Sequence, residues 1–86
     1  MKTAKLNMSD GQEKGQGLLS LGGNLTLDNV DQIAHFFREA VDKYPKLSVE
    51  LSDVISLDLG FLQLLWSLEV AVQQKGDSLG VHMDLN

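Results

Sequence analysis

The stretch that decides the fold is "SLDLGFLQLLW", residues Ser56 to Trp66, in which an aspartate stands two residues before a glycine and a nearly continuous apolar run follows. Aspartate is a preferred N-cap residue, because its carboxylate accepts hydrogen bonds from the free N–H groups of a helix's first turn. Asp58 is therefore predicted to cap a helix by accepting from the N–H of Gly60 or Phe61. That role makes it a structural residue rather than a catalytic one.

The residues on either side of this corner indicate a strand before it and a helix after it. In "KLSVELS" (46–52) apolar and polar residues alternate, as in a half-buried strand, and "DVISLD" (53–58) reads as its continuation or as a turn. The helix of 59–76 is expected to end at Gly76, which suits a left-handed C-cap. A last short strand is predicted within 77–86.

The N-terminal half of the chain predicts two strands and an amphipathic helix. "KLNMSDGQEKGQGLLSLGG" (5–23) reads as two short strands around a glycine-rich turn, so residues 1–16 are expected to form an edge strand and a flexible loop. "LTLDNVDQIAHFFREAVDKYP" (25–45) has one apolar face, with Thr26 or Asp28 as the expected N-cap. That face consists of Val30, Ile33, Ala34, Phe37, Val41 and Tyr44.

The order of these elements is β-β-α-β-α-β. Strands joined through a helix run parallel, whereas strands joined by a tight turn run antiparallel. We therefore expect an α/β fold in which one domain spans 1–86, with a mixed sheet of about four strands and both helices packed on one face.

The composition of the chain restricts its partners. The chain has 86 residues, no cysteine, and 12 acidic against 7 basic residues, for a formal net charge of −5. Without cysteine there is no disulfide and no thiolate metal site. The negative charge opposes binding to nucleic acid and to anionic membrane surfaces. No segment has the apolar length of a signal-peptide core or a membrane span, so we expect a cytoplasmic protein that binds another protein or a small ligand.

The residues that carry chemistry in enzymes are not arranged for it in this sequence. Neither His35 nor His82 lies in a recognisable metal-ligand set of cysteine, histidine and carboxylate residues, so no metal site is expected. No serine lies in a nucleophile-elbow motif, and no glycine-rich loop ends in the Lys-Ser/Thr pair of a phosphate site. We therefore predict neither enzymatic activity nor a cofactor.

The helix after Asp58 has more apolar surface than packing on a sheet requires. One apolar stripe consists of Phe61, Leu64, Leu65, Leu68 and Val72, and a second of Leu62, Trp66 and Val70. Either both stripes are buried in a small core, or one of them, carrying Phe61 or Trp66, is a surface that binds a protein. The sequence leaves these two interpretations open.

Four segments of the chain resemble, in the same order, segments of the STAS domain, the fold of bacterial anti-sigma factor antagonists and of the cytoplasmic tail of sulfate transporters. They are "GGNLTLDNVDQI", "LSVELSDVISLD", "DLGFLQLL" and "QQKGDSLGVHM". They are similar to the family's helix entry, its central strand, its Asp-Ser/Thr-Ser/Ala-Gly-Leu-x-x-Leu segment and its returning strand. The resemblance covers the chain from about residue 17 to residue 85.

This resemblance implies a docking role for the second helix. In the family, the antagonist docks on a GHKL-type kinase, the anti-sigma factor, and phosphorylation of a Ser or Thr at the start of this helix breaks the complex. Asp58 corresponds to the family aspartate and Gly60 to the phosphoacceptor, so the acceptor hydroxyl is absent. A family glycine is replaced by Phe61. The candidate partner-binding residues are Leu59, Phe61, Leu62, Trp66 and Val70.

The leading interpretation is a non-catalytic STAS-type interaction module in bacterial regulatory signalling, of the partner-switching or chemotaxis-linked kind. Its partner would be a GHKL-type kinase, another signalling protein or a second copy of the chain. The family usually adds a helix after the last strand, whereas this sequence stops at Asn86. Either the chain is cut short, or a partner or second copy covers that face of the sheet. The alternatives are the small STAS subunit of a lipid-transport ATPase and, from another class, a small nucleotide- or ligand-binding domain.

Overall fold

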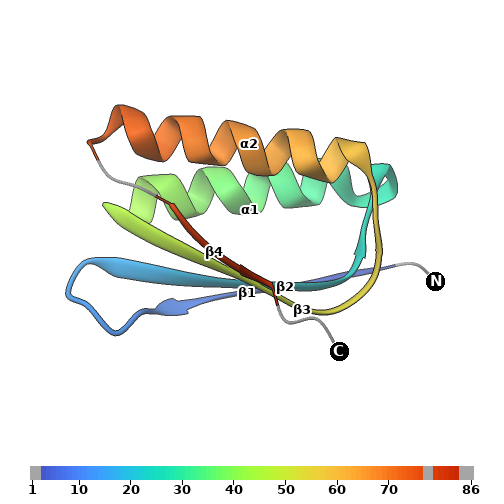
Figure 1. Ribbon diagram of the computed structural model, residues 1–86, viewed down its shortest axis with the longest axis horizontal. Coiled ribbons are helices and arrows are strands. Elements are labelled where there is room, and N and C mark those ends of the chain that lie inside the picture. Colours follow the sequence, from blue (N-terminus) through green and yellow to red (C-terminus); the bar gives the residue numbers. More distant parts are fainter. Residues whose placement is uncertain (1–2, 77–78, 84–86) are drawn as a thin grey trace.

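The computed structural model describes residues 3–76 and 79–83 and forms one sheet with two α-helices (Figure 1). The elements follow the predicted order, with a single 3₁₀ turn, η1, added before the first α-helix. They are β1 (Ala4–Asp10), β2 (Gln16–Leu25), η1 (Leu27–Asn29), α1 (Val30–Lys43), β3 (Lys46–Leu57), α2 (Leu59–Gln74) and β4 (Gly80–Met83).

The sheet is mixed, and its strand order is β1-β2-β3-β4. β1 and β2 form an antiparallel hairpin, while β3 runs parallel to both β2 and β4. Figure 1 shows α1 and α2 side by side on the same face of this sheet. The predicted α/β architecture, with four strands and helices on one face, is therefore confirmed.

The core lies between the two helices and the sheet. From α1 it takes Ile33, Phe37 and Ala40, and from α2 it takes Phe61, Leu68 and Val72. The sheet contributes Leu19, Leu21, Leu25, Leu47, Val49 and Leu51, each at most 2% exposed. The first of the two α2 stripes thus faces the sheet, with Leu64 and Leu65 half-buried at its border.

The start of α1 differs from the sequence prediction. Neither Thr26 nor Asp28 caps it: the N-cap residue is Asn29, and its side chain makes no capping hydrogen bond. The Asn29 amide donates instead to the Asn24 carbonyl oxygen at 2.8 Å. The N–H of Leu27 donates to the carboxylate of Asp58 at 2.8 Å. The entry of this helix is therefore held by contacts to the ends of β2 and β3.

β3 continues through "DVISLD" rather than turning there, but it bulges on the way. Leu51 faces Leu21 and Val54 faces Gly23, so three steps along β3 match two along β2. Asp53 absorbs the extra residue by adopting a left-handed backbone, with φ of 55°. Beyond this point β3 exposes apolar side chains, with Ile55 76% exposed.

Candidate functional site

The corner between β3 and α2 is organised by the carboxylate of Asp58. This residue has the N-cap position of α2, and its Oδ1 accepts a hydrogen bond from the N–H of Phe61 at 3.2 Å. Its Oδ2 accepts from the N–H of Leu27 at 2.8 Å. A single side chain therefore holds the start of α2 against the start of η1, two segments about thirty residues apart in the sequence.

Gly60 lies beneath the side chain of Leu27. A β-carbon placed on Gly60 would lie 3.1 Å from Leu27 Cγ and 3.2 Å from Asp58 Oδ1. A serine at this position therefore needs Leu27 to move by a few tenths of an ångström. Leu27 is 66% exposed and has room for that movement.

Phe61 is wrongly placed among the partner-binding residues by the sequence interpretation. Its side chain is 1% exposed, and its ring centroid lies 6.3 Å from that of Phe37 in the core. The reason is helical spacing: Phe61, Leu68 and Val72 fall on one face, which α2 turns toward the sheet. A ring in that position does not project from the corner, so Phe61 is not one of the candidate partner-binding residues.

Three other candidates form an exposed apolar row along α2. Leu59 and Trp66 are each 68% exposed, and Leu62 is 43% exposed. Their spacing of three and four residues puts them on one face of the helix. Val70, the fourth candidate, is half-buried. We call Leu59, Leu62 and Trp66 the exposed row.

Two exposed apolar residues near this end of α2 were missed by the sequence interpretation. Leu27 covers Gly60, and Ile55 lies on the bulged half of β3, three residues before Asp58. Leu27 lies three residues before Val30 and seven before Ala34, in step with the apolar face of α1, so helical spacing would have predicted it to be buried. No local sequence pattern marks Ile55, which is the extra residue at a second register shift, where Val54 faces Gly23 and Ser56 faces Asn24.

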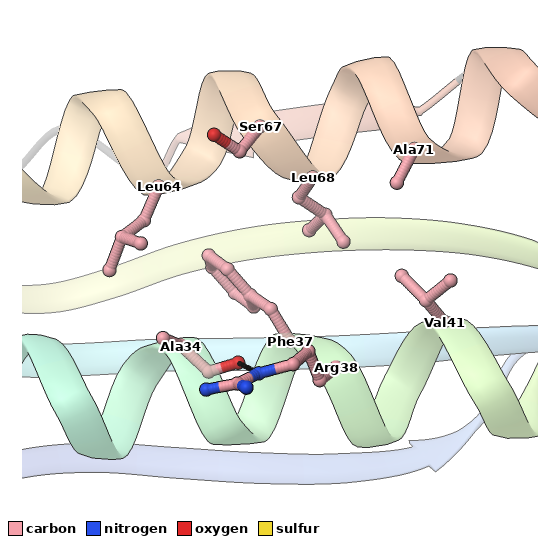
Figure 2. Close-up of a pocket in the computed structure, with 8 residues that line it drawn as sticks. All are labelled: Ala34, Phe37, Arg38, Val41, Leu64, Ser67, Leu68 and Ala71. Carbon is pink, nitrogen blue, oxygen red and sulfur yellow. Dashed lines mark hydrogen bonds between the residues drawn. The ribbon is translucent and has the colours of Figure 1, made fainter.

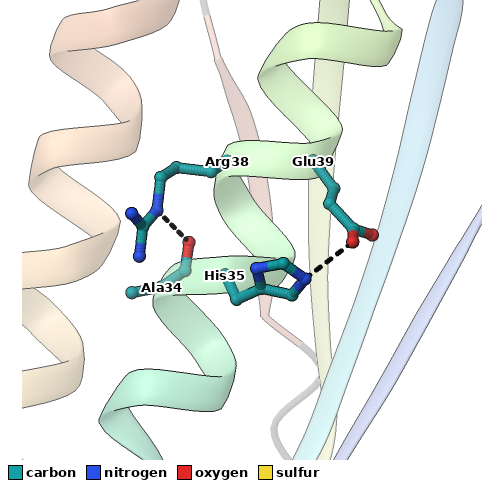
Figure 3. A network of polar contacts seen from close by, with 4 residues as sticks. All are labelled: Ala34, His35, Arg38 and Glu39. Atoms are coloured by element: carbon teal, nitrogen blue, oxygen red, sulfur yellow. Dashed lines mark hydrogen bonds and ion pairs between the residues drawn. The ribbon is translucent and has the colours of Figure 1, made fainter.

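Outside this corner, the described ranges 3–76 and 79–83 contain no group of three or more His, Asp or Glu side chains that could hold a metal ion. His35 pairs with Glu39 at 2.7 Å on the exposed side of α1 (Figure 3). His82 lies on β4 in register with Glu50 of β3. None of the helices in this part of the chain is long and apolar enough to cross a membrane.

Comparison with known proteins identifies the family to which this fold belongs. The family model described as "Mlab, STAS domain" matches residues 8–83. This match covers most of the chain, and the chain belongs to the STAS domain family.

Among solved structures, the chain is similar to an antisigma-factor antagonist, a STAS domain from Rhodobacter sphaeroides, with a TM-score of 0.67 and 13% sequence identity. The alignment covers 92% of this chain and 85% of the other. At that identity the match shows a shared fold. No curated protein matches the sequence.

Proposed function

We propose that this chain is a non-catalytic protein-interaction module of bacterial regulatory signalling, acting in the cytoplasm and docking on its partner through the exposed row of α2. The observation that carries the proposal is the exposure of Leu59, Leu62 and Trp66 on one face of a helix whose opposite face fills the core. The expected partner is a GHKL-type anti-sigma kinase or another signalling protein.

The energetics of the exposed row support a docking role. Large apolar side chains gathered on one face of a folded domain mark interaction surfaces more often than scattered ones do. Tryptophan is the residue most enriched among binding hot spots, where truncation costs about 2 kcal/mol or more. The Trp66 ring contributes little to the core, because it is 68% exposed. The Trp66 side chain is therefore better explained by a contact with a partner than by the stability of the fold.

Gly60 determines what kind of docking we propose. With no hydroxyl at this position, a kinase has no acceptor there, so the contact is not released by phosphorylation of the α2 start. This favours a second candidate, the small STAS subunit of a lipid-transport ATPase, because a permanently docked subunit needs no phosphoryl switch. Both candidates use the same exposed row and differ in the partner.

A pull-down with matched variants tests the docking surface. Leu62 and Val81 are both 43% exposed, but Val81 lies on β4, away from the exposed row. We expect Leu62→Ser and Trp66→Ser to weaken partner recovery at least tenfold, as loss of about 1.4 kcal/mol or more requires, while Val81→Ser retains it. Circular dichroism verifies that all three variants fold.

The identity of the recovered protein separates the two candidates. A GHKL-type kinase supports the signalling role, whereas a transporter ATPase supports the second candidate. Light scattering of the purified chain shows whether a second copy occupies the exposed row. If the row variants retain their partner as well as Val81→Ser does, α2 does not dock through this face and the proposal is wrong.

A further inference from the structure

The two helices leave a groove between them on the side away from the sheet. Its volume is about 260 Å³. The walls facing each other carry small residues, Ala34 on α1 and Ser67 and Ala71 on α2, so the side chains do not fill the space between the helices. Phe37 and Leu68, which are 5% and 3% exposed, form its apolar floor (Figure 2).

One charged group lines this groove, the guanidinium of Arg38. Its Nε donates a long hydrogen bond of 3.5 Å to the carbonyl oxygen of Ala34, one turn back along α1. Within residues 3–76 and 79–83, no carboxylate lies at ion-pair distance from Arg38. The acidic neighbour Glu39 pairs with His35 instead, as Figure 3 shows. Arg38 therefore lines the groove as an exposed cation with no carboxylate partner among the described residues.

The wall opposite Arg38 adds a hydroxyl. Figure 2 shows Ser67 on α2 and Arg38 on α1, with the Phe37 ring reaching between them over the floor of the groove. A guanidinium presents a planar fork of donors that matches a carboxylate, and a hydroxyl adds one further donor. The groove thus combines an apolar floor with a guanidinium on one wall and a hydroxyl on the other.

We propose that this groove binds a small amphiphile, a saturated apolar chain that ends in a carboxylate. The chain would lie on Phe37 and Leu68, and the carboxylate would pair with Arg38. An apolar cavity of about 150 Å³ takes up benzene, so 260 Å³ has room for a longer chain. Drug-sized ligands need about 300 Å³ or more, which makes a slender ligand the better fit.

This site is separate from the exposed row. Leu62 and Ala71 are nine residues apart, so at 3.6 residues per turn they project from opposite sides of α2. A ligand in the groove would contact the Ala71 side and leave the Leu62 side free. The proposal therefore does not depend on the proposed function, and the two can fail independently.

Three matched probes test the chemistry of the site by amide chemical-shift mapping in solution. Octanoate has both the chain and the carboxylate, 1-octanol has the chain alone, and acetate has the carboxylate alone. We expect octanoate, kept below its micelle-forming concentration, to shift the amides of Ala34, Phe37, Ser67 and Ala71. Octanol should bind roughly tenfold more weakly, because it lacks the charge-assisted bonds, and acetate should shift none of these amides.

Three variants, one of them a charge control, test whether Arg38 binds the carboxylate of the ligand. Arg38→Gln is expected to weaken octanoate binding roughly tenfold without changing octanol binding. Lys43→Gln removes the same charge from α1 outside the groove and should leave both unchanged. Ala71→Leu should weaken both ligands, because it occupies the groove.

Several results would overturn the proposal. If octanoate and octanol bind with equal affinity, and Arg38→Gln does not change that affinity, the groove does not recognise a carboxylate. Octanoate shifts confined to the amides of Leu59, Leu62 and Trp66 mean non-specific contact with exposed apolar surface. If octanoate causes no shifts up to its solubility limit, the groove does not bind the amphiphile. If Arg38→Gln then weakens a protein complex, the groove receives a partner's side chains instead.

Discussion

The two helices of this domain lie on the same face of one sheet and have similar lengths, 14 residues in α1 and 16 in α2, yet they treat solvent differently (Figure 1). Every exposed residue of α1 is polar or charged. α2 buries its own apolar stripe and, in addition, exposes Leu59, Leu62 and Trp66. Packing on the sheet requires one apolar face from each helix, so it does not explain the exposed row of α2.

The helix starts differ as well. α2 begins at a side-chain cap, whereas α1 begins after a 3₁₀ turn without one. The cap of α2 also supports the entry to α1, because Asp58 accepts from the N–H of Leu27. α2 therefore begins at a side-chain cap that also anchors the entry to α1, which fits the docking role proposed for the exposed row.

The largest effect is expected from the buried face of α2. Phe61→Ala should lower the free energy of unfolding by about 3–5 kcal/mol, because it removes a fully buried ring and leaves a cavity. Trp66→Ala, in the same helix, should change it by no more than about 0.5 kcal/mol. Urea unfolding monitored by circular dichroism measures both. Similar losses from the two substitutions would mean that Trp66 is a core residue and that the contrast between the faces is false.

This contrast also shows what the sequence could predict. Helical spacing predicts one stripe of Phe61, Leu64, Leu65, Leu68 and Val72, but it leaves open whether this stripe or the second one faces the core. The structure buries Phe61, Leu68 and Val72 and half-buries the other two. Phe61 was nevertheless assigned to the interface because it replaces a family glycine, and a family position does not reveal which way a ring points. Only the packing of α2 on the sheet shows that the Phe61 ring points inward.

Other features were out of reach of sequence reasoning because they depend on distant segments. The entry to α1 is held by Asp58, about thirty residues away, so no local pattern around Thr26 or Asp28 could reveal it. Ile55 is the extra residue at the second register shift of β3 against β2, between Val54 and Ser56, and that register is not visible in the sequence. The parallel pairing of strands joined through a helix and the placement of both helices on one face, by contrast, followed from connectivity.

The second prediction sharpens the difference between the helix starts. Asp58→Ala should cost about 1–2 kcal/mol of stability, because two backbone N–H groups lose their acceptor. For a domain of this size, that corresponds to a fall in Tm of roughly 4–15 °C. Asp28→Ala, at an exposed acid that the structure does not use as a cap, should change Tm little. An unchanged Tm for Asp58→Ala together with lost partner binding would instead make Asp58 a contact residue.

A smaller effect is expected at Gly60. Serine favours the helix over glycine by a few tenths of a kcal/mol, while its β-carbon presses on Leu27, so Gly60→Ser should alter stability by no more than about 0.5 kcal/mol. The variant should become a substrate for a cognate kinase, whereas the natural chain stays unmodified at this helix start. Mass spectrometry after incubation with ATP and kinase distinguishes them. Phosphate on Ser56 or Ser67 of the natural chain, with release of a partner, would show that a switch persists elsewhere.

The smallest effect concerns the far end of α1, where it is tied to the sheet rather than left free. The Tyr44 hydroxyl donates to Asp10 Oδ1 at 2.8 Å, joining the C-cap of α1 to the end of β1. This hydrogen bond, with burial and the nearby carboxylate charge, raises the pKa of Tyr44 above its ordinary value of 10.0. A pKa raised by folding means that the stabilisation is complete below pH 10 and is lost as the pH rises through the folded-state pKa.

Thermal melting between neutral and strongly alkaline pH therefore tests this tie. The natural chain should lose stability as Tyr44 ionises beside Asp10, because the phenolate can no longer donate and the two anions repel each other. Tyr44→Phe should be slightly less stable at neutral pH, and its alkaline decline should be shallower. Asp10→Asn separates the causes: it removes the repulsion but retains an oxygen that accepts from the hydroxyl. If Tyr44→Phe declines as steeply as the natural chain, the alkaline loss arises from lysine deprotonation elsewhere, and Tyr44 does not anchor the end of α1 to β1.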